Sequence, residues 1–118
     1  MLTNLPRMND PQPITLLALK EANEKHPPVF NSTHEGYAIL KEEMEECYDE
    51  LSLLQRELHI LWNMVKEDST WDGFSTQLTT MQANAYRLIT EATHTSAMVM
   101  KLHAFVRTQI AKKEHEDM

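Results

Sequence analysis

Residues 32–66 read STHEGYAILKEEMEECYDELSLLQRELHILWNMVK, and this stretch decides the fold. Ser32 followed by Glu35 has the spacing of a capping box, which marks the start of a helix. After Gly36 the stretch contains neither glycine nor proline, and its apolar side chains recur with the 3.6-residue period of a helix. It therefore predicts one long helix over 33–66. The apolar stripe expected to face the core is Tyr37, Leu40, Met44, Cys47, Tyr48, Leu51, Leu54, Leu58, Leu61, Trp62 and Val65.

The segment before this helix predicts a shorter one over 14–25. Pro13 suits the first turn of a helix, and His26-Pro27-Pro28 ends the pattern. We expect the short helix to dock through its apolar side chains, which are Ile14, Leu16 and Leu17.

A second long helix is predicted after a connection over 68–74, where Asp72-Gly73 has the composition of a turn. This helix is expected to begin at Ser75 or Thr76 and to end near Lys112. Its apolar stripe is Met81, Ala85, Leu88, Ala92, Thr95, Val99, Leu102, Val106 and Ile110. The expected organisation is an N-terminal extension over 1–30, a helical hairpin over 31–112 and a disordered tail over 113–118.

The predicted fold is therefore all-α, with a long antiparallel helical hairpin and a short N-terminal helix. Each long helix spans about 50 Å at 1.5 Å per residue. A lone hairpin leaves its apolar stripes half exposed, and two hairpins packed together bury them as a four-helix bundle. We therefore expect the chain to bind itself, as a homodimer or a tetramer.

Composition excludes several classes of protein. The 118 residues carry a formal net charge of −7, which argues against nucleic acid or an anionic membrane as the main partner. A single cysteine, Cys47, excludes an internal disulfide and favours a reducing, cytoplasmic location. The sequence shows neither a signal peptide nor the roughly 20 apolar residues of a membrane span.

Acidic side chains crowd one segment of the first long helix. Three of them, Glu43, Glu46 and Glu50, are spaced i, i+3 and i+7, so they form one strip beside the apolar stripe. Aligned carboxylates repel one another unless a cation lies between them. Mg²⁺ is the natural candidate because it takes oxygen ligands. The crowded residues are Glu42, Glu43, Glu45, Glu46, Asp49 and Glu50.

The second long helix carries Glu91 and, three residues later, His94. Together with Glu42-Glu43-Met44-Glu45-Glu46, a Glu-Glu-x-x-Glu motif, this pair resembles the MazG-like all-α nucleoside triphosphate pyrophosphohydrolases. The resemblance covers residues 32–105, and the sequence over 34–46 looks most like the small phage-type members.

The resemblance implies hydrolysis of a nucleoside triphosphate to the monophosphate and pyrophosphate. It implies that Glu43, Glu46, Glu91 and His94 hold Mg²⁺, or Mn²⁺, on the phosphates. His94 stands where the family has aspartate. A neutral imidazole is a poorer Mg²⁺ ligand than a carboxylate and suits softer metals. Glu46 or Glu50 would be the general base that activates a water.

Three alternatives stay open at the level of sequence. The acidic run can be a solvated helix face with i,i+4 partners. The chain can be a non-enzymatic, oligomeric helical bundle that keeps only the fold, or a relative with impaired catalysis. Finally, a dimer would bring together two Glu91-x-x-His94 motifs and two further glutamates, which is the ligand inventory of a carboxylate-bridged di-metal bundle.

Overall fold

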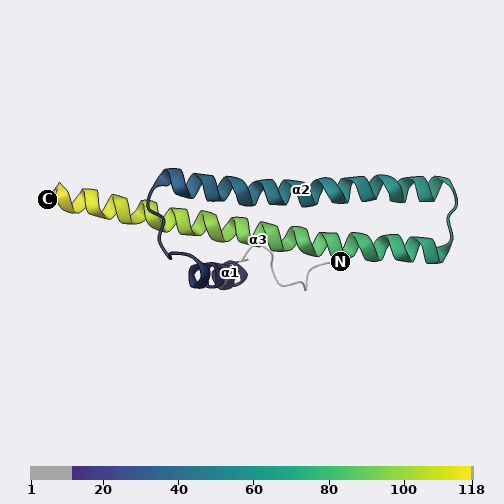
Figure 1. Ribbon diagram of the computed structural model, residues 1–118, viewed down its shortest axis with the longest axis horizontal. Coiled ribbons are helices and arrows are strands. Elements are labelled where there is room, and N and C mark those ends of the chain that lie inside the picture. Colours follow the sequence, from purple (N-terminus) through teal and green to yellow (C-terminus); the bar gives the residue numbers. More distant parts are fainter. Residues whose placement is uncertain (1–11, 118) are drawn as a thin grey trace, which may run out of the picture. The chain divides into compact units, whose positions relative to one another are not determined.

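The computed structural model describes residues 12–117, and within that range the chain is helical and contains no strand (Figure 1). The helices are α1 (Gln12–Lys25), α2 (Thr33–Lys66) and α3 (Trp71–Glu116). The all-α prediction is confirmed. The first part of the predicted N-terminal extension, residues 1–11, lies outside the described range. None of the described helices combines the length and the apolar character that crossing a membrane requires.

The helices contribute to two compact units. Unit 1 comprises the chain up to Lys41 together with the chain from Thr93 onwards, and unit 2 comprises Glu42–Ala92. Both α2 and α3 pass from one unit into the other, so each unit contains a segment of each long helix.

Unit 1 is built around an apolar core. Phe30, Ala97 and Met98 are buried. Lys101 is buried beside them; its Nζ donates to the Pro27 carbonyl at 2.8 Å and lies 4.7 Å from the centre of the Phe30 ring. The charge is therefore satisfied by a carbonyl and an aromatic face. Partly buried side chains complete the core: Ala18, Leu19, Ala22, Ile39, Leu40, Leu102 and Phe105.

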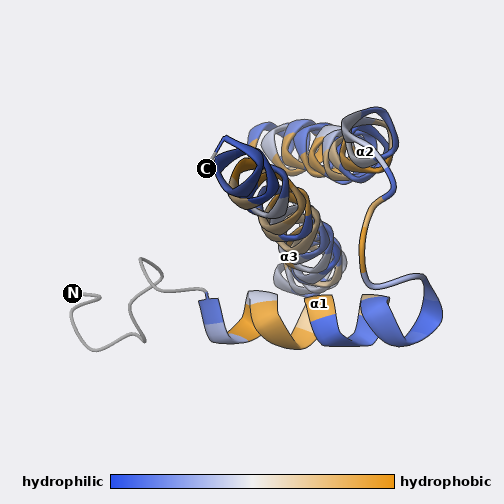
Figure 2. Ribbon diagram, turned by 90° about the vertical axis from the view of Figure 1, so that its left-hand side faces the viewer, coloured by the Kyte–Doolittle hydropathy of each residue, from blue (hydrophilic) through white to orange (hydrophobic). Residues whose placement is uncertain are grey.

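Helix α1 runs across the part of α3 that belongs to unit 1 (Figure 2). Its docking face differs from the prediction, because Ile14, Leu16 and Leu17 are exposed. The buried face is instead Thr15, Ala18, Leu19 and Ala22. Thr15 is only 2% exposed, and its hydroxyl shares a 2.9 Å hydrogen bond with the Ser96 hydroxyl. Small side chains in this face allow the close crossing, whereas the larger ones point outwards.

The start of α2 follows the sequence signal. The backbone N–H of Glu35 donates to the Ser32 hydroxyl at 3.1 Å, so Ser32 is the predicted N-cap. The Glu35 carboxylate accepts a hydrogen bond from the Asn31 side chain at 3.0 Å. One turn into the helix, a Cβ on Gly36 would lie 2.5 Å from Leu102 Cδ1 and 3.2 Å from Phe30 Cδ2. A larger residue at position 36 would therefore force the Leu102 side chain to move, and glycine suits this close approach of α2 to the core of unit 1.

In unit 2, α2 and α3 run antiparallel through a short connection over 67–70 (Figure 1). Asp68 takes a left-handed conformation with φ of 58°. The Thr70 hydroxyl accepts from the Gly73 N–H at 3.0 Å and caps α3. The prediction of a turn at Asp72-Gly73 was wrong, since both residues lie in the first turn of α3. At the other end α3 continues through Glu116, four residues past the expected end at Lys112.

At the seam between the two helices of unit 2 the fully buried side chains are polar, whereas the half-buried side chains of this unit include the apolar Leu54, Leu61, Met81 and Leu88. Its buried residues are Glu57 and Asn84, each 6% exposed. Asn84 Nδ2 donates to Glu57 Oε1, and Gln77 Nε2 donates to the Glu57 carbonyl at 3.0 Å. The apolar stripe that the sequence predicted to face the core is largely exposed in the single chain. Its exposed members are Tyr37 in unit 1 and, in unit 2, Met44, Tyr48, Leu51, Leu58, Trp62 and Val65.

Candidate metal site

Three of the predicted metal ligands lie together. Glu43, Glu91 and His94 each offer one ligand atom, a carboxylate oxygen or an imidazole nitrogen, and these atoms lie within 4.8 Å of one another. Glu91 and His94 are three residues apart on the unbroken helix α3, so helix geometry alone brings their side chains to one face. Glu43 reaches Glu91 across the hairpin of unit 2 from α2.

The spacing of the three atoms is compatible with a small divalent cation. Metal–ligand bonds of about 2.1 Å place neighbouring ligands of an octahedral ion roughly 3 Å apart and opposite ligands roughly 4 Å apart. A modest side-chain adjustment would therefore bring the three atoms onto one ion. The donor set is two carboxylates and one imidazole, which together suit Mn²⁺, Fe²⁺ or Zn²⁺ better than an all-oxygen set would.

The other two predicted site residues are placed differently. Glu46 is exposed and does not belong to the group of three. Glu50 is half-buried, and it lies two helical turns after Glu43, about 10.5 Å along the helix axis. Among the described residues, Glu50 Oε2 is a buried oxygen that accepts no hydrogen bond. Of the two candidate bases, Glu46 is therefore nearer to the group and more accessible to water.

One polar pair of the seam was missed by the sequence analysis. Glu57 continues the strip of Glu43 and Glu50 at the same seven-residue spacing, and Asn84 precedes Glu91 by seven. Glu57 is more deeply buried than either glutamate before it on the strip. Its Oε2 accepts no hydrogen bond from the described residues, although Asn84 occupies its other oxygen. The repeat of seven was visible in the sequence and could have identified this pair.

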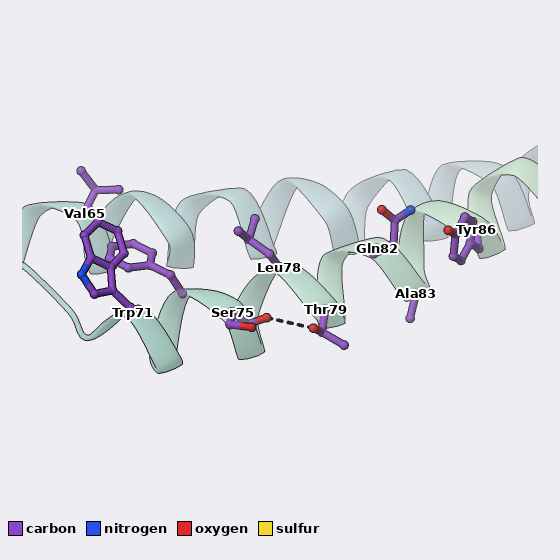
Figure 3. Close-up of a pocket in the computed structure, with 9 residues that line it drawn as sticks. Val65, Trp71, Ser75, Leu78, Thr79, Gln82, Ala83 and Tyr86 are labelled. Atoms are coloured by element: carbon purple, nitrogen blue, oxygen red, sulfur yellow. Dashed lines mark hydrogen bonds between the residues drawn. The ribbon is translucent and has the colours of Figure 1, made fainter. Parts of the chain in front are cut away.

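A second feature of unit 2 is an open groove of about 1000 Å³ along α3 (Figure 3). Two aromatic side chains, Trp71 and Tyr86, lie towards its two ends. The Thr79 hydroxyl donates to the Ser75 carbonyl at 2.9 Å, so this hydroxyl is occupied within the helix. The lining residues are Val65, Trp71, Phe74, Ser75, Leu78, Thr79, Gln82, Ala83 and Tyr86.

Two cations of α3 that could bind phosphates have other partners. Lys101 is buried in the core of unit 1, and the Arg87 guanidinium donates to Asn84 Oδ1 at 3.4 Å. Neither residue belongs to the group of Glu43, Glu91 and His94.

Comparison of the chain with protein-family models, with curated proteins and with solved structures finds no significant match.

Proposed function

We propose that this chain is a divalent-metal-dependent, nucleoside triphosphate pyrophosphohydrolase-like protein. The proximity of Glu43, Glu91 and His94 within 4.8 Å carries the proposal. Two carboxylates held this close repel each other, and a divalent cation relieves that repulsion. The cytoplasm, where nucleoside triphosphates are abundant, remains the expected location.

A role for each residue follows from its position. Glu43 and Glu91 would hold the ion through carboxylate oxygens, with His94 as the third ligand. A bound Mg²⁺ or Mn²⁺ neutralises phosphate oxygens and acidifies a coordinated water. Glu46, one turn after Glu43 and exposed, would be the preferred base to accept a proton from the attacking water, with Glu50 as the more distant candidate.

His94 makes the choice of metal a test of the proposal. Imidazole favours Mn²⁺ over Mg²⁺, whereas carboxylate favours the harder ion. We expect His94→Asp to shift the metal preference towards Mg²⁺ without unfolding the chain. Titration of both metals by isothermal calorimetry, on wild type and variant, measures this shift.

We also propose that two hairpins pair into a four-helix bundle. Such a bundle is compatible with two alternative functions, a structural oligomer and a di-metal protein. The exposed apolar residues of unit 2 favour self-association whether or not the chain is an enzyme. A paired bundle without catalysis would be a structural, non-enzymatic oligomer. The His94 imidazole favours the other alternative, a carboxylate-bridged di-metal bundle with iron or manganese.

The deciding experiment is pyrophosphate release from a panel of standard and modified nucleoside triphosphates, with Mg²⁺ and with Mn²⁺. We expect release in wild type and its loss in Glu43→Gln, which keeps the shape of the side chain and removes its charge. Glu45→Gln is the matched control, because Glu45 is exposed on the same helix and lies outside the group of three.

Each of the other outcomes favours a different site or a different function. Equal release from both variants would remove Glu43 from the site. No release with any triphosphate, but stoichiometric iron or manganese in the purified protein, would favour the di-metal bundle. No release and no metal would favour the structural oligomer.

A further inference from the structure

Unit 2 lacks an apolar core of its own. Across residues 42–92, which are all described, the buried side chains are those of Glu57 and Asn84. Large apolar side chains of α2 lie outside instead, with exposed fractions from 43% to 69%. Six of them form one surface, here called the outer face: Met44, Tyr48, Leu51, Leu58, Trp62 and Val65. A hairpin whose fully buried side chains are polar, and whose exterior carries large apolar side chains, gains free energy when another molecule buries that exterior.

The outer face has the repeat of a helix–helix interface. Met44, Leu51, Leu58 and Val65 follow one another at intervals of seven residues, and Tyr48 and Trp62 follow two of them by four. This is the spacing of a coiled-coil seam. At about 100° per residue the outer face lies roughly 105° round α2 from the strip of Glu43, Glu50 and Glu57. A helix of a four-helix bundle contacts two neighbours in this way, one through each face.

The row of the outer face with the seven-residue repeat is self-complementary when reversed, and Tyr48 and Trp62 then lie opposite positions 61 and 47. A two-fold axis between Leu54 and Gln55 pairs position 44 with position 65, and position 51 with position 58. An isologous interface requires this property, because residue i of one copy must meet residue j of the other and the reverse.

Charge selects the antiparallel orientation. The segment 42–50 carries six carboxylates, whereas across 59–67, the segment opposite it about this axis, the charges of Lys66 and Glu67 cancel. Parallel pairing would align the two acidic segments and oppose twelve like charges. Antiparallel pairing sets each acidic segment opposite a segment without net charge. The Lys66 ammonium lies 5.7 Å from the centre of the Trp62 ring, at the same end of the outer face.

We infer that a second copy of this chain covers the outer face, with the two α2 helices antiparallel about an axis at Leu54 and Gln55. This inference rests on the proposed pairing of hairpins and adds its face, its register and its orientation. It places Lys66 of each copy beside the acidic segment of the other, where it brings a cation towards the end of the hairpin that holds Glu43.

Single-cysteine disulfide formation tests the inference on the full chain, in a Cys47→Ser background that removes the native thiol. Gln55→Cys lies beside the axis, so two copies should form a disulfide under mild oxidation. Met44→Cys lies about 16 Å from the axis at 1.5 Å per residue, so its two copies are about 32 Å apart and should not. The double variant Met44→Cys with Val65→Cys should regain efficient crosslinking.

The possible outcomes test three things separately: the orientation of the paired α2 helices, dimerisation itself and the proposed metal-dependent function. Rapid crosslinking of Met44→Cys alone would indicate parallel pairing and overturn the orientation. A monomer in analytical ultracentrifugation, with no crosslink from any variant, would overturn the pairing itself. Binding of Mn²⁺ by Glu43, Glu91 and His94, measured on the same proteins, reports on the proposed function independently of either result.

Discussion

Units 1 and 2 bury opposite kinds of side chain, although they share the same two long helices. Unit 1 buries Phe30, Ala97 and Met98 within the chain. Unit 2 buries Glu57 and Asn84 and leaves Leu58 and its neighbours exposed. One continuous helix can therefore contribute to an internal core at one end and expose large apolar side chains at the other.

The cause lies in which stripe of α2 faces α3. In unit 1, Gly36 allows a close approach and Ile39 and Leu40 pack against the core. In unit 2 the facing residues include Glu43 and Glu57, whose carboxylates need donors or cations. Polar groups in a seam lower its stability but fix its register and create a place for chemistry. Unit 1 therefore contains the apolar core, whereas the two carboxylates of the candidate site, Glu43 and Glu91, belong to unit 2.

The largest effect is expected from emptying the core of unit 1. Phe30→Ala should lower the free energy of unfolding by about 3–5 kcal/mol, because it removes a buried aromatic ring and the cation–π contact with Lys101. Val29→Ala is the matched control, since Val29 is 59% exposed at the preceding position. Urea denaturation followed by circular dichroism measures both. Equal losses from the two variants would contradict the assignment of the core.

Next in size is truncation of the outer face. Leu58→Ala should weaken pairing by about 2 kcal/mol per copy, or roughly 10³-fold in the dimer dissociation constant, because three buried carbons are lost from each chain. Ile60→Ala is the control, since Ile60 is similarly exposed but points away from the outer face. Sedimentation equilibrium gives both constants. If Ile60→Ala dissociates the dimer equally, the interface lies elsewhere on α2.

A smaller loss is expected from the polar seam. Asn84→Ala should cost roughly 1.5 kcal/mol, since it leaves the buried Glu57 carboxylate without its donor. The double variant Glu57→Leu with Asn84→Leu should recover that loss, because it replaces both buried polar groups by apolar ones. Thermal unfolding of the three proteins completes the comparison. A double variant less stable than Asn84→Ala would show that the pair contributes more than its mutual hydrogen bond.

The sequence was sufficient to predict the helices but not to predict which side of each helix is buried. Ser32 and Lys66 bound α2 as predicted, because capping and the end of the periodic pattern are local signals. The start of α3 was misplaced because Asp72-Gly73 resembles a turn, whereas Thr70 caps the helix before it. Periodicity shows that a helix is amphipathic. What packs against its apolar stripe depends on tertiary or quaternary contacts, which the local sequence does not encode. The exposed Met44 and Leu51 illustrate this limit.

The candidate site depends on local and non-local geometry to different degrees. The relation of Glu91 to His94 is set by helical spacing, so the sequence contains it. The proximity of Glu43 to Glu91 depends on the register of the hairpin, and the connection is shorter than predicted. Glu46 was grouped with Glu43 from spacing along α2, yet it is exposed. Spacing along one helix therefore predicts a ligand less well than placement between the two helices does.

The smallest effect is expected from removing the N-cap of α2 or of α3. Ser32→Ala removes the N-cap of α2 and should cost about 1 kcal/mol, and Thr70→Ala should cost a similar amount at α3. Their consequences differ, because Ser32 adjoins the core of unit 1 whereas Thr70 adjoins the connection of unit 2. Amide hydrogen exchange should therefore show faster exchange at 35–41 in Ser32→Ala and at 73–77 in Thr70→Ala. Thr33→Ala, exposed and next to the cap, is the control and should leave both segments unchanged. Exchange that rises equally in both segments for either variant would mean that the two units open together, despite their different interiors.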